Sequence, residues 1–222
     1  MTRLIRIDDF PHGDKRLFFS GDQFRYRQLV KQALSVFEEN SVDYILGVSP
    51  MLFQPGDIEF LNQNVKKGKC VYHGFTHGWE RDWASITSSW PTGGEFSGLS
   101  VTDISERYNK TIADMRQISR FSHEHFIAPF NCYTQELLDF LKNTPTKFIH
   151  TSDEFWDEYG LSSLEYYDMI PEVSKFGVTY DYANKVIGNL KDESQITLHW
   201  CYDAQSPNWL EDYTRLCKEL TK

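Results

Sequence analysis

Cysteine is scarce in this sequence, and the spacing of the few cysteines excludes a disulfide-rich domain and a structural zinc domain. The 222 residues include four cysteines, and none of them forms a CxxC pair. Four widely spaced cysteines are too few for a disulfide framework and do not fit a structural zinc site. We therefore expect buried, reduced thiols of the kind found in cytoplasmic proteins. The cysteines are Cys70, Cys132, Cys201 and Cys217.

Long apolar runs and an excess of positive charge are also missing. No window reaches the roughly 18 apolar residues of a membrane span, and the opening MTRLIRIDDF carries charges where a secretory leader needs an apolar stretch. The 23 basic residues are outnumbered by 32 acidic ones, which gives a net charge of −9. Nucleic-acid backbones and anionic membranes require basic residues, so we expect neither as a partner. The chain is predicted to be soluble and cytoplasmic.

Aromatic residues, in contrast, are abundant at 15% of the chain, which excludes a disordered protein. Short apolar runs alternate with amphipathic stretches, as in LIRI at 4–7 followed by QFRYRQLVKQALSVFEE at 23–39. Strands that alternate with helices predict a mostly parallel sheet. The number of units and the length predict an α/β fold in one domain spanning 1–222, either a (β/α) barrel of about seven strands or a strongly wound sheet.

The expected elements cover most of the chain. Strands are predicted at 4–7, 42–48, 70–72, 125–128, 147–150, 166–170, 177–180 and 195–199, and helices at 23–39, 57–65, 101–120, 134–142, 182–190 and 207–220. Polar residues collect where the strands end, at the edge that builds the active site in α/β barrels. These residues are Asp8, Asp9, His73, His77, Asn131, Asp153 and His199.

Several of these residues suit metal and acid–base chemistry. His73 and His77 lie four residues apart, so on a helical turn both imidazoles would face one side and could bind one Zn²⁺-like ion. Asp9 would complete a set of two histidines and a carboxylate, with an open position for water and substrate. For each residue a plainer interpretation stays open. Asp8 and Asp9 also suit the cap of a turn, and His199 is either a core histidine or a general acid that titrates near neutrality.

Four short motifs follow one another from residue 7 to residue 199: Ile7-Asp8-Asp9, His73-x-x-x-His77, Ala128-Pro129-Phe130 and Leu198-His199. Their order resembles the polysaccharide deacetylase superfamily, which is also called the NodB-homology family or carbohydrate esterase family 4 (CE4). The resemblance implies a distorted (β/α) barrel. It also implies a metal-dependent hydrolase that removes acetyl groups from N- or O-acetylated sugars, with a metal-bound water as nucleophile.

The resemblance also implies a role for each motif residue. Asp8 would be the general base and His199 the general acid, and Asp9, His73 and His77 would bind one divalent ion, Zn²⁺ before Co²⁺, Ni²⁺ or Mn²⁺. The remaining roles follow from the same motifs and their neighbours. The Phe130 N–H would hold the oxyanion, Asp153 or else Asp157 would tune the acid histidine, and Leu198 would line the acetyl pocket. Pro129, Trp79 and Trp200 stand beside proposed site residues and would line the substrate cleft, although tryptophans also suit packing on the barrel rim.

Three positions depart from the family pattern. Phe10 stands where a glycine follows the acid pair, Gly74 stands where a serine or threonine follows the first histidine, and no arginine precedes Ala128 to orient the base. Arg81 is one candidate replacement for that arginine. The missing arginine favours one alternative, a catalytically silent sugar-binding or assembly module. A C–N hydrolase that acts on a non-sugar amide is a further alternative. A cytoplasmic location favours a small acetylated sugar or amide over a cell-wall polymer as substrate.

Overall fold

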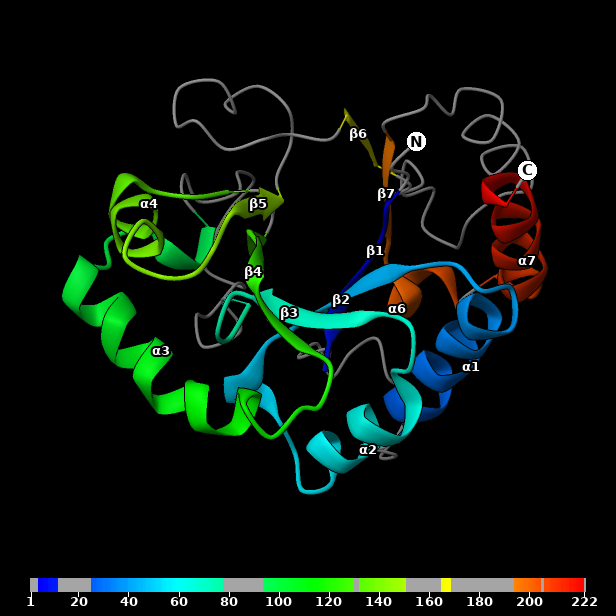
Figure 1. Cartoon of the computed structure of the whole chain (residues 1–222), viewed down its shortest axis with the longest axis horizontal. Coiled ribbons are helices and arrows are strands. Elements are labelled where there is room, and N and C mark those ends of the chain that lie inside the picture. The colour runs from blue at the N-terminus through cyan, green and yellow to red at the C-terminus, as the bar shows by residue number, and fades with distance from the viewer. Residues whose placement is uncertain are drawn as a thin grey trace.

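A computed structural model describes residues 4–11, 25–77, 94–129, 132–150, 165–168, 194–204 and 206–221. Within them, one seven-stranded sheet has the order β5-β4-β3-β2-β1-β7-β6. All six neighbouring pairs are parallel. This is the cyclic strand order of a (β/α) barrel that is open between β5 and β6, and the sheet curls into a half-barrel (Figure 1). The strands are β1 (Leu4–Phe10), β2 (Tyr44–Val48), β3 (Lys69–His73), β4 (Phe121–Ile127), β5 (Phe148–His150), β6 (Glu165–Asp168) and β7 (Ser194–Leu198).

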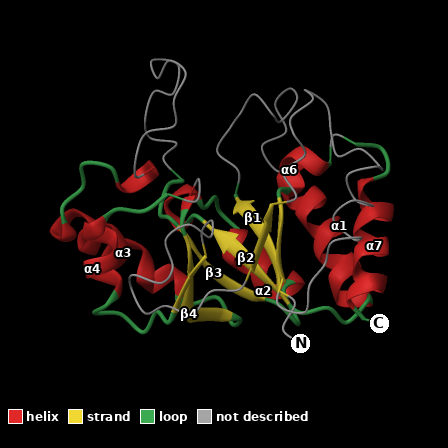
Figure 2. Cartoon of the chain, turned by 90° about the horizontal axis from the view of Figure 1, so that it is seen from above, coloured by secondary structure: helices red, strands yellow, loops and turns green. Residues whose placement is uncertain are grey.

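Helices surround the outer side of the curved sheet (Figure 1). Helix α1 packs against α7 at one end of the sheet and α3 against α4 at the other, as the view from above shows (Figure 2). None of the helices in the described ranges is long and apolar enough to cross a membrane. The helical elements are α1 (Arg25–Glu39), η1 (Pro50–Leu52), α2 (Asp57–Asn64), η3 (Gly94–Phe96), α3 (Val101–Met115), α4 (Gln135–Leu141), α6 (Trp200–Asp203) and α7 (Trp209–Leu220).

The start of α3 is fixed by a capping box. Ser100 Oγ accepts a hydrogen bond from the Asp103 N–H at 3.2 Å, and the Asp103 carboxylate accepts one from the Ser100 N–H at 2.8 Å. Two of the amides that lack partners inside the first turn are thereby satisfied. Thr134 caps α4 by a single bond, with Oγ1 accepting from the Leu137 N–H at 3.3 Å.

The two faces of the sheet differ in chemistry because successive strand residues point to opposite sides. On β1, Ile5 and Ile7 belong to the large apolar cluster that the strands form with the helices. Arg6 and Asp8 alternate with them and face the concave side. The small cluster of Ile45, Val71 and Ile127 also lies apart from the main core. The concave side therefore holds the buried charges of Arg6 and Asp8 beside this small apolar cluster.

The predicted distorted barrel is confirmed, and most predicted helices begin and end within two residues of the observed ones. Helix α3 is the exception, because it ends at Met115 and not at residue 120. The short elements η1, η3 and α6 were not predicted. The strand predicted at 177–180 and the helix predicted at 182–190 lie outside the described residues.

Candidate metal centre

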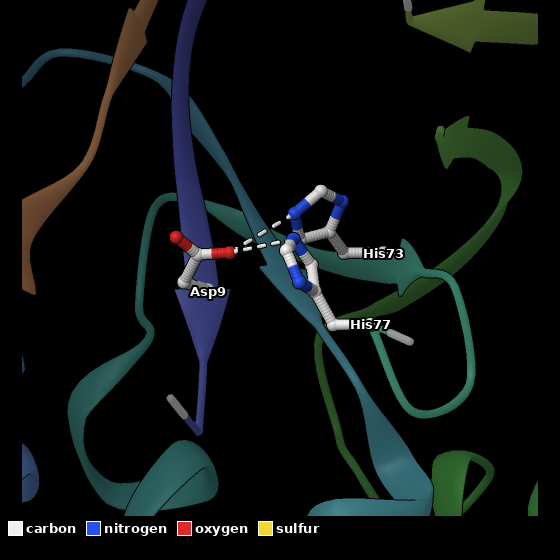
Figure 3. A group of neighbouring side chains, drawn as sticks. All are labelled: Asp9, His73 and His77. Atoms are coloured by element: carbon white, nitrogen blue, oxygen red, sulfur yellow. Dashed lines mark hydrogen bonds and ion pairs between the residues drawn. The ribbon is translucent and has the colours of Figure 1, made fainter. Parts of the chain in front are cut away.

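Three predicted metal ligands meet at the carboxyl ends of β1 and β3 (Figure 3). Asp9 Oδ1 lies 3.2 Å from His73 Nε2 and 3.0 Å from His77 Nε2. All three side chains are buried, and one ligand atom from each lies within 4.8 Å of the others. Two imidazoles and a carboxylate form the donor set of many hydrolytic zinc sites, which leave one position open. The triad could therefore hold a divalent ion.

The two histidines are brought together by a left-handed turn. His73 is the last residue of β3, Gly74 has a φ of 64°, and His77 has a φ of 53°. The helical turn that the spacing predicted is therefore wrong, although the two imidazoles do lie side by side. Asp9 also has a positive φ, 71°. Such a conformation is costly for residues other than glycine, and strain of this kind is concentrated at functional sites.

The hydrogen bond on the far side of His73 determines what this ring presents to Asp9. His73 Nδ1 lies 3.3 Å from the carbonyl oxygen of Ile127. Because a carbonyl oxygen only accepts, this contact assigns the proton of the neutral ring to Nδ1 and leaves a lone pair on Nε2. That lone pair then faces Asp9 Oδ1 at 3.2 Å. With the ring neutral, a cation between this lone pair and the carboxylate oxygen would be bound by both, so the donor chemistry fits a metal ion.

Asp8 is held by Arg6, a residue that the sequence interpretation did not select. Arg6 Nε donates to Asp8 Oδ1 at 2.8 Å, and Arg6 Nη2 donates to Oδ2 at 2.6 Å. Both residues are 1% exposed. Asp8 Oδ2 also lies 3.8 Å from His73 Nε2 and 3.8 Å from His199 Nε2. The Asp8 carboxylate therefore lies between the triad and His199, with its orientation fixed by a two-point contact.

The buried charges shift one another's pKa values. Burial by itself raises the pKa of Asp8, but the Arg6 guanidinium outweighs it, and the net shift is downward. Burial is likewise outweighed at Asp9, where the charge of His77 holds the pKa well below its usual range. Burial lowers the pKa of His73, whereas at His77 the Asp9 charge outweighs burial and raises the pKa. Both carboxylates are thus ionised at neutral pH, as a cation site requires.

The other selected residues differ in what the structure says of them. His199 has a side chain 15% exposed, more than any member of the triad. Leu198 and Trp200 are completely buried in the main apolar cluster, and Pro129 is buried beside Gly74. Their substrate-binding role stays a prediction. Phe130, Asp153, Trp79 and Arg81 lie outside the described residues.

Three residues near the site were missed by the sequence interpretation. Arg6 could have been found, because residues two apart on a strand share a face and Asp8 is two residues on. Glu95 accepts hydrogen bonds from the turn between the histidines, and Cys201 Sγ lies 3.7 Å from Asp9 Oδ2. Both contacts join residues that are distant in sequence, so no local pattern predicts them.

No protein-family model and no curated protein matches the chain. Solved structures of CE4 proteins do match it over almost its whole length. The peptidoglycan deacetylase PdaC from Bacillus subtilis has a TM-score of 0.60 at 14% identity, over 98% of this chain and 83% of that one. A family 4 acetyl xylan esterase from Clostridium thermocellum, in complex with a cobalt ion, has a TM-score of 0.59 at 13% identity, over 99% and 84%.

A third match is a CE4 family pseudoenzyme from Bacillus anthracis, with a TM-score of 0.58 at 11% identity. That match covers 99% of this chain but only 61% of the pseudoenzyme. At such low identities the matches establish the fold, which is the distorted half-barrel of the CE4 proteins. The resemblance inferred from the four motifs is confirmed at this level. Because enzymes and a pseudoenzyme share the fold, the function has to be argued from the side chains.

Proposed function

We propose that this protein is a metal-dependent hydrolase that removes an acetyl group from an N- or O-acetylated sugar or a related amide. The observation that carries the proposal is a cluster of five titratable side chains from three separate segments of the chain. The likeness in fold to CE4 deacetylases and esterases supports the reaction class. The five residues are Asp8, Asp9, His73, His77 and His199.

Asp9, His73 and His77 would hold one divalent ion, with Zn²⁺ preferred and Co²⁺, Ni²⁺ or Mn²⁺ as alternatives. When bound, such an ion would polarise the acetyl carbonyl and lower the pKa of a neighbouring water molecule. The residues of the chain prepare the site for this charge. The carboxylates of Asp8 and Asp9 are ionised and buried, and the Nε2 atoms of His73 and His77 both approach Asp9 Oδ1.

Asp8 and His199 divide the proton transfers. Asp8 is ionised at neutral pH and accepts the proton of the attacking water as general base. His199 is the most exposed of the five residues, so it lies nearest to the side from which a substrate enters, and it protonates the departing nitrogen or oxygen. The other roles rest on the motif resemblance or, for the two tryptophans, on their place beside site residues in the sequence. They are the oxyanion contact of the Phe130 N–H, the tuning of His199 by Asp153, and the substrate contacts of Leu198, Pro129, Trp79 and Trp200.

Arg6 orients the proposed base, Asp8, although this chain lacks the arginine of the family's third motif. The family pattern orients the base with an arginine in the third motif, and this chain has none there. Arg6 makes the corresponding guanidinium–carboxylate pair from β1, two residues before Asp8. A fixed, ionised base favours the enzyme over the silent sugar-binding or assembly module.

An acetate-release screen tests the proposal. Purified protein with added Zn²⁺ or Co²⁺ is incubated with a panel of N-acetyl sugars, O-acetyl sugars and small N-acyl amides. We expect acetate from at least one acetylated sugar, and a loss of about 10²–10⁴-fold in rate for Asp8→Asn. Asp43→Asn, a change at an exposed aspartate, is the matched control. Metal binding without any acetate release would favour the silent module, and turnover of non-sugar amides alone would favour the C–N hydrolase.

A further inference from the structure

A buried carboxylate is directed at the turn that carries both histidines. Glu95, in η3, is completely buried. Its Oε1 and Oε2 accept from the Phe75 N–H at 3.0 and 3.2 Å, and Oε1 also accepts from the Thr76 N–H at 3.2 Å. These amides lie between His73 and His77, so the carboxylate binds the backbone that connects the two imidazoles.

The Glu95 carboxylate occupies the space that a side chain at Gly74 would fill. A Cβ atom at Gly74 would lie 2.1 Å from Glu95 Oε2 and 2.5 Å from Pro129 Cγ, and the φ of 64° would strain any other residue there. A side chain at this position and the Glu95 carboxylate therefore exclude each other. Gly74, which departs from the family pattern, is what allows Glu95 to reach the backbone of the turn.

The turn is held from several sides. Arg107 Nη1, on α3, lies 3.7 Å from Glu95 Oε1 and connects the carboxylate to that helix. On the opposite side, the Met51 N–H donates to the Phe75 carbonyl at 2.9 Å, and Ser49 Oγ donates to the His73 carbonyl at 2.7 Å. Glu95 binds amide donors of the turn, whereas Ser49 and Met51 bind its carbonyls. A backbone with His77 at a left-handed φ is kept in place by such contacts.

We propose that Glu95 is a positioning residue of the metal centre. Its carboxylate fixes the backbone of residues 74–76, so that His73 and His77 present their Nε2 atoms to one ion. Glu95 acts through the backbone, in the way that outer partners orient metal ligands elsewhere. The inference rests on the metal-binding role proposed above for the triad. It gives Gly74 a purpose in this chain, because the absence of a side chain there is what lets the Glu95 carboxylate reach the turn.

Two measurements on Glu95→Ala and Glu95→Gln test this role. The first is the affinity for Zn²⁺ and Co²⁺ by calorimetry, and the second is amide hydrogen exchange at Phe75 and Thr76 in the metal-free protein. We expect Glu95→Ala to weaken metal binding by about 10–100-fold and to speed exchange at both amides by at least about tenfold. Glu95→Gln retains one acceptor oxygen and should have smaller effects of the same sign. Glu106→Ala and Glu106→Gln, changes at an exposed glutamate of α3, should match the wild type.

The outcomes separate this role from the proposed function. If the wild type binds metal and Glu95→Ala binds it within about twofold as tightly, the positioning role is wrong and the proposed function stands. If Glu95→Ala does not fold, Glu95→Gln decides by the same criterion. If the wild type binds no divalent ion, or if its metal binding survives in His77→Ala, the metal-binding proposal fails. The role of Glu95 in metal binding then fails too.

Discussion

At the scale of single residues, the ion pair between Arg6 and Asp8 decides whether the site has a usable base. Taking two charges out of water is costly, and removing one partner of a buried pair typically costs about 3–5 kcal/mol because the other charge is left uncompensated. Both residues are 1% exposed. Replacing a buried ion pair by well-packed apolar residues is often neutral or stabilising, so stability alone does not explain this pair.

Arg6→Lys separates the orientation of Asp8 from its charge. Lysine keeps the positive charge but cannot make the two-point contact that Arg6 Nε and Nη2 make with the carboxylate. We expect kcat to fall by about 10–100-fold with little change in KM, and metal affinity to stay within about twofold. Steady-state kinetics on the substrate found in the screen, together with calorimetry, provide both values.

The exposed Arg116→Lys is the control for this substitution and should behave as wild type. If Arg6→Lys lost metal affinity in proportion to its activity, Arg6 would be supporting the whole cluster and not the base alone. Equal activity in Arg6→Lys and wild type would contradict the orienting role.

The triad itself could be predicted from the sequence, because Asp9, His73 and His77 are separated by recognisable motif spacings. Their partners could not all be predicted. Arg6 can be found once strand periodicity is applied to the Asp8 motif. Glu95 contacts a turn some 20 residues earlier in the chain. That contact depends on the tertiary fold, so no spacing rule predicts it.

At the scale of elements, strand β2 makes room for His73 through Gly47. A Cβ atom at Gly47 would lie 3.0 Å from His73 Cβ and 3.0 Å from Ile127 Cδ1. Gly47→Ala should therefore displace His73 by a few tenths of an ångström, weaken metal binding measurably, and cost about 1–3 kcal/mol in the free energy of unfolding. Calorimetry and urea denaturation measure the two effects.

Gly98→Ala is the informative control for that substitution. Nothing lies within 4 Å of a Cβ atom there, but the φ of 76° makes alanine unfavourable. This variant should lose about 1–2 kcal/mol of stability with unchanged metal affinity. If both alanine variants lowered metal affinity equally, global destabilisation and not the position of His73 would be the cause.

The capping box of α3 is predicted to contribute to stability, since this helix carries Arg107 toward Glu95. Ser100→Ala removes the hydroxyl that accepts from the Asp103 N–H, and it should cost about 0.5–2 kcal/mol in urea denaturation. Thr102→Ala, an exposed change in the same turn, should lower the free energy of unfolding by much less than Ser100→Ala does. Equal losses in the two variants would argue against the cap.

Most helices could be predicted because an apolar period of 3.6 residues is a local property. The turn after β3 was misinterpreted for the same reason. A spacing of four between histidines is typical of a helix, but Gly74 and His77 have left-handed φ values of 64° and 53°, and the amides between them donate to the distant Glu95. Local pattern predicted which side chains meet, whereas tertiary contacts determined how.

At the scale of the whole molecule, the parallel half-barrel explains why residues nearly 200 positions apart form one cluster. Strand β1 pairs with both β2 and β7, and β2 pairs with β3, so the carboxyl ends that carry Asp8, His73 and His199 lie along one edge. The alternation of strands and helices predicted the parallel sheet, and the resemblance of the four motifs implied the distorted barrel. The opening between β5 and β6 was not predictable, because strand pairing across a barrel is not encoded locally.

Packing of the sheet against its helices also predicts a weakness at alkaline pH. Burial raises the pKa of Cys70 from 9.0 to about 12, so the folded state favours the neutral thiol. Stability from this group is complete below about pH 9 and is lost as the pH rises toward about 12, because the unfolded thiol ionises first. The free energy of unfolding, measured by urea denaturation, falls when the pH is raised from about 8 to about 10.5. In Cys70→Ala this fall should be about 2 kcal/mol smaller than in the wild type. Identical losses in the two proteins would show that Cys70 ionises equally easily in both states.

Anomalous X-ray diffraction from crystals grown with Zn²⁺ or Co²⁺ shows whether one divalent ion binds between Asp9, His73 and His77. We expect one strong anomalous peak within bonding distance of Asp9 Oδ1, His73 Nε2 and His77 Nε2, at about 2.0–2.2 Å from each atom for zinc. The peak should be lost in His77→Ala. If no peak lies at the triad, or if it persists unchanged in that variant, these three residues are not the metal ligands.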